Sequence, residues 1–305
     1  MALLVVGSVA YDSVETPYDR VEDALGGSAT FFSAAASFFT PVHLVAVVGS
    51  DFQTAQVDFL RERGVDFSGL TIEEGKTFRW KGRYLENMVD RETIETQLNV
   101  FQDFNPILPA SFCDDATVFL ANIGPELQYH VVRQMHRPQF IAMDTMNYWI
   151  QGAPQELRRT LATVDALLIN DSEVRELSGE TSLLKGVKKI QTMGPKTLVV
   201  KKGENGAMLF HESDLFVCPA FPVDRVFDPT GAGDTFAGGF MGTISMKNDF
   251  SVATLRQAMV FATALASFAV EGFGVDRLRT LQKAAINQRV QRLYEMTHFE
   301  LESLS

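Results

Sequence analysis

Apolar and polar positions follow two rhythms along most of the chain. Short runs of β-branched and other apolar residues, typical of buried strands, are separated by longer stretches in which apolar positions have helical spacing. The predicted strands are Leu3–Val6, Val42–Val48, Thr117–Ala121, Phe140–Met143, Ala166–Ile169 and Thr197–Lys201. The predicted helices are Ser28–Phe39, Phe52–Arg63, Glu126–Met135, Gln155–Ala162, Glu173–Leu177, Leu183–Thr192, Ala232–Ser245, Val252–Val270 and Arg277–Tyr294. This order predicts a single α/β domain over residues 1–305, whose mostly parallel sheet is covered by helices on both faces.

One region departs from these rhythms and predicts an inserted β-hairpin at approximately residues 75–100, with a short contribution from residues near 12–25. In Thr77–Tyr84, the aromatic residues Phe78, Trp80 and Tyr84 fall on one face of a strand. Period-two alternation returns between Ile94 and Val100 after a polar stretch. Two interpretations of the insert are open: a lid that closes over a substrate, or an extension of the edge of the main sheet.

Composition and charge exclude several classes of protein. The chain has 305 residues, and 27 Lys and Arg against 38 Asp and Glu give a net charge of −11, which argues against a nucleic-acid partner. The longest apolar stretch, Val260–Val270, is about half a membrane span, so we expect no membrane partner. The N-terminus lacks the basic region and cleavage site of a signal peptide. Cys113 and Cys218 match no metal or redox spacing, so we expect a cytoplasmic protein without structural zinc.

The stretch from Val226 to Phe240 carries the most chemical information. Asp228-Pro229 favours a turn, and Gly231 and Gly233 allow close backbone approach to a ligand at the start of a helix. The amides of a helix N-terminus bind anions, and Asp234 follows in the first turn. A carboxylate beside a phosphate site is useful when it takes a proton from a hydroxyl that attacks phosphorus. In the alternative, Asp234 only complements the helix dipole and the glycines only allow tight packing.

The segment Asp228–Asp234, followed by Thr235-Phe236, resembles the second signature of the ribokinase family, also called the PfkB carbohydrate kinases. Gly26-Gly27 before a helix resembles its first signature, Asn170–Glu173 its NxxE motif, and Lys201–Gly206 its nucleotide-loop strand end. The resemblance extends over the whole chain. It implies a ribokinase-like three-layer α/β sandwich with a small β lid, ATP as the phosphoryl donor and Mg²⁺ as a cofactor.

The resemblance also implies roles for individual residues on the donor side. Asp234 would be the catalytic base, and the amides of Gly231, Ala232 and Gly233 would stabilise the transferring phosphoryl group. Asn170 and Glu173 would lie near Mg²⁺ and the phosphates and act through water. The alternative for this pair is a helix cap with an acid in the first turn. The resemblance assigns four further residues to the nucleotide, namely Lys201, Gly203, Gly206 and Thr230. It also assigns Asp228 and Thr230 to a K⁺ ion.

On the acceptor side, the resemblance implies that Asp12 accepts hydrogen bonds from sugar hydroxyls and that Gly26 and Gly27 allow close approach. The chain departs from the family where Ala10 and Phe31 stand in place of two asparagines, which removes polar contacts to a sugar. Aromatic rings can stack on a nucleobase; the candidates here are Phe31, Phe78 and Trp80. These rings favour a nucleoside, and the hairpin and Asp144–Trp149 also resemble bacterial nucleoside kinases of this family. The same aromatics also fit the interior of a lid or a homodimer interface formed through it.

The leading hypothesis is an enzyme that moves the γ-phosphoryl group of ATP to a primary hydroxyl of an adenosine-like nucleoside or a sugar. The alternatives are a free-sugar kinase for ribose, fructose or a related sugar, and a non-catalytic module that senses nucleotides or sugars. The intact Asp234 and its anion-binding turn argue against the non-catalytic module. A dinucleotide oxidoreductase is excluded, because Gly7–Tyr11 after the first strand is not a GxGxxG motif.

Overall fold

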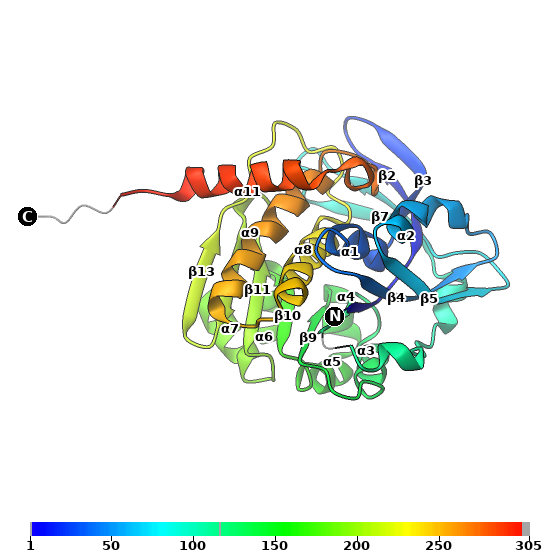
Figure 1. The fold of residues 1–305 in the computed structure, drawn as a ribbon, viewed down its shortest axis with the longest axis horizontal. Coiled ribbons are helices and arrows are strands. Elements are labelled where there is room, and N and C mark those ends of the chain that lie inside the picture. The colour runs from blue at the N-terminus through cyan, green and yellow to red at the C-terminus, as the bar shows by residue number, and fades with distance from the viewer. Residues whose placement is uncertain (1, 116, 301–305) are drawn as a thin grey trace, which may run out of the picture.

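The computed structural model describes residues 2–115 and 117–300, which fold around a nine-stranded sheet (Figure 1). The strand order is β13-β12-β11-β10-β9-β8-β1-β4-β5. All neighbours from β5 to β11 pair in parallel, whereas β12 and β13 form an antiparallel edge. The strands are β1 (Leu3–Val6), β4 (Val42–Gly49), β5 (Val65–Glu73), β8 (Thr117–Leu120), β9 (Phe140–Asp144), β10 (Ala166–Asn170), β11 (Thr197–Lys201), β12 (Ala207–His211) and β13 (Asp214–Cys218).

The six strands predicted from apolar runs are confirmed, and their parallel arrangement follows from the helices between them. Strands β5, β12 and β13 were not predicted. β5 and β13 lie at the two edges of the sheet and are partly exposed; β5 is interrupted by polar residues, whereas β13 has a run of only four apolar residues, Leu215 to Cys218.

Helices cover both faces of the sheet, and this confirms the three-layer α/β fold. Alternate residues of β1 divide between two cores, because Leu3 and Val5 pack with one helix layer while Leu4 and Val6 pack with the other. The first layer contains α1 (Ser28–Ala36), α2 (Asp58–Glu62), α8 (Ala232–Lys247), α9 (Val252–Ala269), α10 (Asp276–Thr280) and α11 (Lys283–Thr297). The second contains α3 (Pro125–Val132), α4 (Asn147–Gly152), α5 (Pro154–Leu161), α6 (Asp171–Ser178) and α7 (Leu183–Gln191).

Two predicted helices are divided in the structure. The segment predicted as Phe52–Arg63 is a 3₁₀ turn over Thr54–Val57 followed by α2, and the segment predicted as Arg277–Tyr294 is α10 and α11. The break falls at Leu281, which adopts an extended conformation. The other short 3₁₀ turns of the described residues are Asn99–Asp103, Ala110–Phe112 and Gly203–Asn205.

A second sheet of four strands lies beside the main one, in the order β3-β2-β6-β7. It is formed by β2 (Ala10–Glu15), β3 (Arg20–Gly26), β6 (Arg79–Tyr84) and β7 (Arg91–Gln97). The antiparallel pairing of β6 with β7 confirms the predicted hairpin. The basic residues that alternate with the aromatic ones on β6 form ion pairs, namely Arg79 with Asp51, Lys81 with Glu22 and Arg83 with Glu15.

Helix α9 is the one helix within the described residues that is long and apolar enough to cross a membrane. Its mean hydropathy is 1.3 and 61% of it is buried inside the protein. It packs between α8 and α11, which is typical of a core helix (Figure 1).

Glycines on α8 allow this helix to pack closely between α1 and α9. A Cβ atom at Gly238 would lie 2.2 Å from the Phe32 carbonyl oxygen of α1, and one at Gly239 would lie 2.9 Å from Ala262 Cα of α9. These contacts fix the position of α8, whose N-terminus follows the predicted anion-binding turn.

We expect Gly238→Ala to lower the free energy of unfolding by about 1 kcal/mol, because an overpacking cost of about 2 kcal/mol exceeds the helix-propensity gain of about 1 kcal/mol. Gly152→Ala on α4 is the matched control, because no atom lies within 4 Å of its added Cβ. Urea unfolding measures both variants. Equal stability of the two would contradict the close packing of α8 on α1.

Candidate active site

The turn before α8 is held in one conformation by contacts with other elements. Gly231 is left-handed, with φ of 72°, and a Cβ atom there would lie 2.3 Å from the ring of Phe31 on α1. The Asp228 carboxylate accepts hydrogen bonds from the Thr230 amide at 2.8 Å and from the Gly274 amide at 3.3 Å. The turn therefore presents the start of α8 in a fixed orientation.

The predicted amide donors are not equivalent in the structure. The Ala232 N–H donates to the Pro229 carbonyl at 3.2 Å and closes the turn. The first turn of a helix leaves its amides without helical acceptors, so the anion-binding amides that we expect are those of Gly231 and Gly233. The role predicted for Ala232 is thereby corrected from phosphoryl binding to shaping the turn.

Asp234 is half-buried in the first turn of α8, beside these amides. Burial and the nearby Asp144 carboxylate raise its pKa to about 7, while Lys201 and Arg91 act in the opposite direction. A carboxylate with a pKa near neutrality is suited to accept a proton from an attacking hydroxyl group.

Three neighbouring parallel strands deliver polar side chains to the same edge of the sheet. β9, β10 and β11 end at Asp144, Asn170 and Lys201. Lys201 Nζ lies 3.0 Å from Asp144 Oδ2 and 3.2 Å from the position that a Cβ atom at Gly233 would occupy. Burial opposes the charge of Lys201, but Asp144 and Glu173 raise its pKa above the usual value. A lysine ammonium group therefore stays charged next to the anion-binding turn.

Asn170 and Glu173 form the helix cap that was the alternative interpretation of this pair. Asn170 Oδ1 accepts a hydrogen bond from the Glu173 amide at 2.8 Å, and Glu173 Oε2 accepts one from the Asn170 amide at 3.0 Å. The pair also belongs to the site electrostatically. Burial and Asp144 raise the pKa of Glu173 to about 7, against the effect of Lys201.

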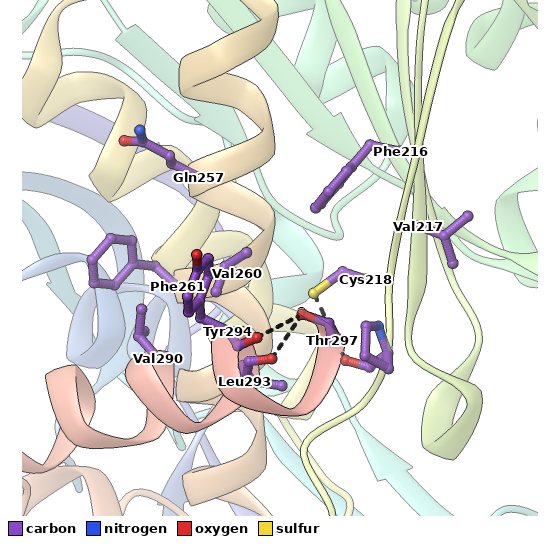
Figure 2. Close-up of a pocket in the computed structure, with 11 residues that line it drawn as sticks. Phe216, Val217, Cys218, Gln257, Val260, Phe261, Val290, Leu293, Tyr294 and Thr297 are labelled. Atoms are coloured by element: carbon purple, nitrogen blue, oxygen red, sulfur yellow. Dashed lines mark hydrogen bonds between the residues drawn. The ribbon is translucent and has the colours of Figure 1, made fainter. Parts of the chain in front are cut away.

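The nucleotide loop predicted at Gly203–Gly206 follows β11 as a tight turn, closed by the Lys202 N–H on the Gly206 carbonyl at 2.8 Å. A Cβ atom at Gly206 would lie 2.1 Å from the Cys218 carbonyl oxygen, so this loop packs on the end of β13. Cys218 also borders an apolar cavity of about 430 Å³ between β13, α9 and α11 (Figure 2). Phe216, Val260 and Leu293 line it. An apolar surface is thus available next to the nucleotide loop.

Asp12 reaches the site from β2 of the second sheet. Asp12 is 6% exposed, and a Cβ atom at Gly26 would lie 2.0 Å from Asp12 Oδ2. Burial and Asp228 raise the pKa of Asp12 to about 7, with a further contribution from Asp234, while a hydrogen bond from the Gly27 amide lowers it. The charge of the predicted base, Asp234, therefore reaches the predicted acceptor carboxylate, Asp12.

The structure corrects the predicted stacking surface for a nucleobase. Phe31 is 1% exposed, and its ring packs beneath Gly231, because α1 runs directly under the turn. The ring of Phe78 stacks on the ring of Phe101, with 5.2 Å between the ring centroids. Trp80 lies over Gly82, and Arg91 Cζ is 5.5 Å from its ring centroid. Phe31 therefore supports the anion-binding turn and cannot stack on a base, whereas Phe78 and Trp80 are half-buried and their stacking role stays a prediction.

Three residues of the site were not among the predicted site residues. Asp144 ends a predicted strand, and the rule that ligands bind at the carboxyl ends of parallel strands would have found it. The Tyr84 hydroxyl lies 3.2 Å from Thr230 Oγ1, so the second sheet touches the turn. Arg91 pairs opposite Tyr84 on β7 and acts on Asp12, Glu173 and Asp234. A polar, exposed strand gave no sequence signal for Arg91.

A helix-start anion site beside a carboxylate of raised pKa, set at the carboxyl edge of a parallel sheet, is suited to phosphoryl transfer. The model of the pfkB family carbohydrate kinases matches residues 2–280, and the chain belongs to that family. It is 26% identical to a cytidine kinase of Thermococcus kodakarensis over 80% of this chain and 88% of that protein. A nucleoside kinase of Methanothermobacter thermautotrophicus is 23% identical over 90% of this chain and 91% of its own length.

Solved structures of kinases share the fold. The aminoimidazole riboside kinase from Salmonella enterica, complexed with aminoimidazole riboside and an ATP analog, superposes with a TM-score of 0.74. The match covers 95% of this chain and all of that chain, at 19% sequence identity. The protein is therefore a carbohydrate kinase of the pfkB family with the ribokinase fold.

Because the pKa of Asp234 is raised to about 7, we expect kcat, measured with the acceptor saturating so that Asp12 is engaged, to fall about tenfold per pH unit below pH of about 7 and to level off above it. The base must be ionised, so its function is lost as pH falls. Initial rates in buffers of constant ionic strength measure this profile. The Glu173→Gln variant should keep this acid limb. A profile that is flat between pH of about 5 and about 8, or one that falls above neutrality, would contradict the assignment.

Proposed function

We propose that the protein phosphorylates the primary hydroxyl of the ribose of a nucleoside, with Asp234 as the base. The observation that carries this proposal is the burial of Asp12 at a site where the charges of Asp228 and Asp234 reach it. A carboxylate accepts two hydrogen bonds from a vicinal diol. A ribose held by its diol at Asp12 then directs its primary hydroxyl towards Asp234 and the anion-binding turn.

Apolar residues favour a nucleoside over a free sugar. Ala10 is fully buried beside Asp12, and Phe31 is turned beneath Gly231. Neither side chain offers a hydrogen bond to the hydroxyl that a free sugar carries at its anomeric carbon. A nucleoside carries a base instead of this hydroxyl, so it loses no contact here. The named activities of the cytidine kinase and nucleoside kinase relatives support the same acceptor.

Mg²⁺ is the cofactor that we propose beside ATP. Within the described residues, no group of three or more His, Cys, Asp or Glu side chains is arranged to hold a metal ion. This fits Mg²⁺, which keeps several waters and binds through phosphate oxygens and one or two carboxylates. Glu173 is the carboxylate that we propose for it, through water. Bound Mg²⁺ would offset the negative charge of the phosphates.

We do not extend the proposal to K⁺ at Asp228 and Thr230. Both Asp228 oxygens accept hydrogen bonds within the fold, from the Thr230 and Gly274 amides. Homodimer formation through the second sheet stays a prediction, supported by the exposed edge strand β7. We also propose a cytoplasmic location, in keeping with the two free cysteines.

The acceptor is tested by ADP release over a panel of nucleosides, pentoses and hexoses. We expect nucleosides to be preferred, and Asp12→Ala to raise the acceptor KM by about 10- to 150-fold with little change in the KM for ATP, since a charged hydrogen bond contributes about 1.5–3 kcal/mol. Glu15→Ala on the same strand is the matched control, because Glu15 is exposed and pairs with Arg83. Preference for free ribose or fructose would instead support the sugar-kinase alternative. A change confined to the KM for ATP would show that Asp12 belongs to the ATP site and not to the acceptor site.

The second sheet should act as a lid that carries Arg91 to the site. Among the described residues, no carboxylate lies within 4.0 Å of Arg91 in an ion pair, whereas Arg83 on β6 pairs with Glu15. We expect Arg91→Ala to lower kcat by about 10- to 100-fold and Arg83→Ala to change it by less than about twofold. Steady-state rates with saturating substrates measure both. Equal effects of the two variants would remove Arg91 from the site and leave the second sheet without this role.

A further inference from the structure

The ion pair between Asp144 and Lys201 joins two strands that are not adjacent. β9 and β11 lie on opposite sides of β10, and the side chains at their carboxyl ends meet above it. Lys201 Nζ lies 3.0 Å from Asp144 Oδ2, and the two side chains are only 19% and 8% exposed. A flexible lysine side chain is thus held in one place at the edge of the sheet.

Asp144 is itself held by its surroundings. Its Oδ1 accepts a hydrogen bond from the Thr145 amide at 2.8 Å, and its backbone carbonyl accepts one from the buried Gln128 side chain at 3.0 Å. One carboxylate oxygen is thus fixed to the backbone, while the other receives the ammonium group. A carboxylate arranged in this way acts as a fixed anchor for the lysine.

The anchored ammonium group points at the start of α8. Lys201 Nζ is 3.2 Å from the place where a Cβ atom of Gly233 would be, so a side chain at residue 233 would crowd the ammonium group. Gly233 is one of the residues whose amide we expect to face the transferring phosphoryl group. A negative charge at Asp144 would repel phosphate if it acted alone. Its contribution to a phosphate site is therefore to hold the ammonium group of Lys201 in place.

We propose that Asp144 is a positioning residue that holds the Lys201 ammonium group against the anion-binding turn. There the ammonium group contacts the phosphoryl group while it is being transferred. This rests on the proposed role of Asp234 and the turn in phosphoryl transfer. Asp144 contributes through Lys201, and it neither binds the acceptor nor coordinates the metal ion.

A double-mutant cycle with Asp144→Asn and Lys201→Met tests this. With the native lysine, Asp144→Asn should lower kcat by about 10- to 100-fold and leave the acceptor KM within about twofold. In the Lys201→Met background, the same substitution should change kcat by less than about twofold, because the group it positions is gone. The double variant has no buried unpaired ammonium group, so it stays informative if Asp144→Asn alone folds poorly. Melting temperatures of all variants are recorded alongside.

Asp165→Asn is the matched control, because Asp165 accepts a hydrogen bond from the Ile141 amide at the opposite end of β9. Its effect on kcat should be equal in both backgrounds.

The pH profile gives a readout that a purely structural role would not move. Asp234 is surrounded by Asp144 on β9, Lys201 on β11, Arg91 on β7 and Asp12 on β2. Removal of the Asp144 charge should therefore move the acid limb of kcat to lower pH.

Equal effects of Asp144→Asn on kcat in both backgrounds would overturn the proposal. A higher Mg²⁺ concentration needed for half-maximal activity of Asp144→Asn would also overturn it, because Asp144 would then be a ligand of the metal ion. A Lys201→Met enzyme with unchanged kcat would also overturn it. None of these outcomes affects the acceptor assignment, which the substrate panel and the Asp12 variant decide separately.

Discussion

The turn from Asp228 to Gly231 is the constraint on which the rest of the site depends. Its left-handed glycine rests on the ring of Phe31, and the Asp228 carboxylate ties it to the loop before α10. The conformation of the turn therefore depends on the relative positions of α1, α8 and the α9–α10 connection. The glycines of α8 determine these positions, because they let the helix pack closely on both α1 and α9. An anion-binding helix start fixed in this way needs little reorganisation when phosphate arrives.

The electrostatics of the site follow from burying carboxylates around that turn. Asp12, Glu173 and Asp234 each have a pKa raised to about 7, chiefly because burial disfavours their charged forms. Lys201 and Arg91 supply the opposing positive charge from the main sheet and the second sheet. A site that only bound a nucleotide would gain nothing from a buried carboxylate near phosphate. A site that removes a proton from a hydroxyl group needs one.

Much of the fold could be predicted from the sequence, because strands buried on both faces leave continuous apolar runs. The edge strand β5 leaves no such run, since polar residues interrupt it where it meets solvent. Asp228, Gly231 and Asp234 could be found because they lie together in one motif. Arg91 could not, because its place depends on how an exposed lid strand lies over the core. Phe31 was assigned to the acceptor from its position in the motif, but only packing determines that its ring turns beneath Gly231.

The central claim is that Asp234 acts in the chemical step and not in binding. Single-turnover rapid-quench measurements on Asp234→Asn, with ATP and a nucleoside bound at saturation, test it most directly. The account predicts that the rate of phosphoryl transfer falls by about 10²- to 10⁴-fold, while the dissociation constants of ATP and the nucleoside stay close to those of the native enzyme. Transfer at the native rate, or a loss explained entirely by weaker ATP binding, would contradict it.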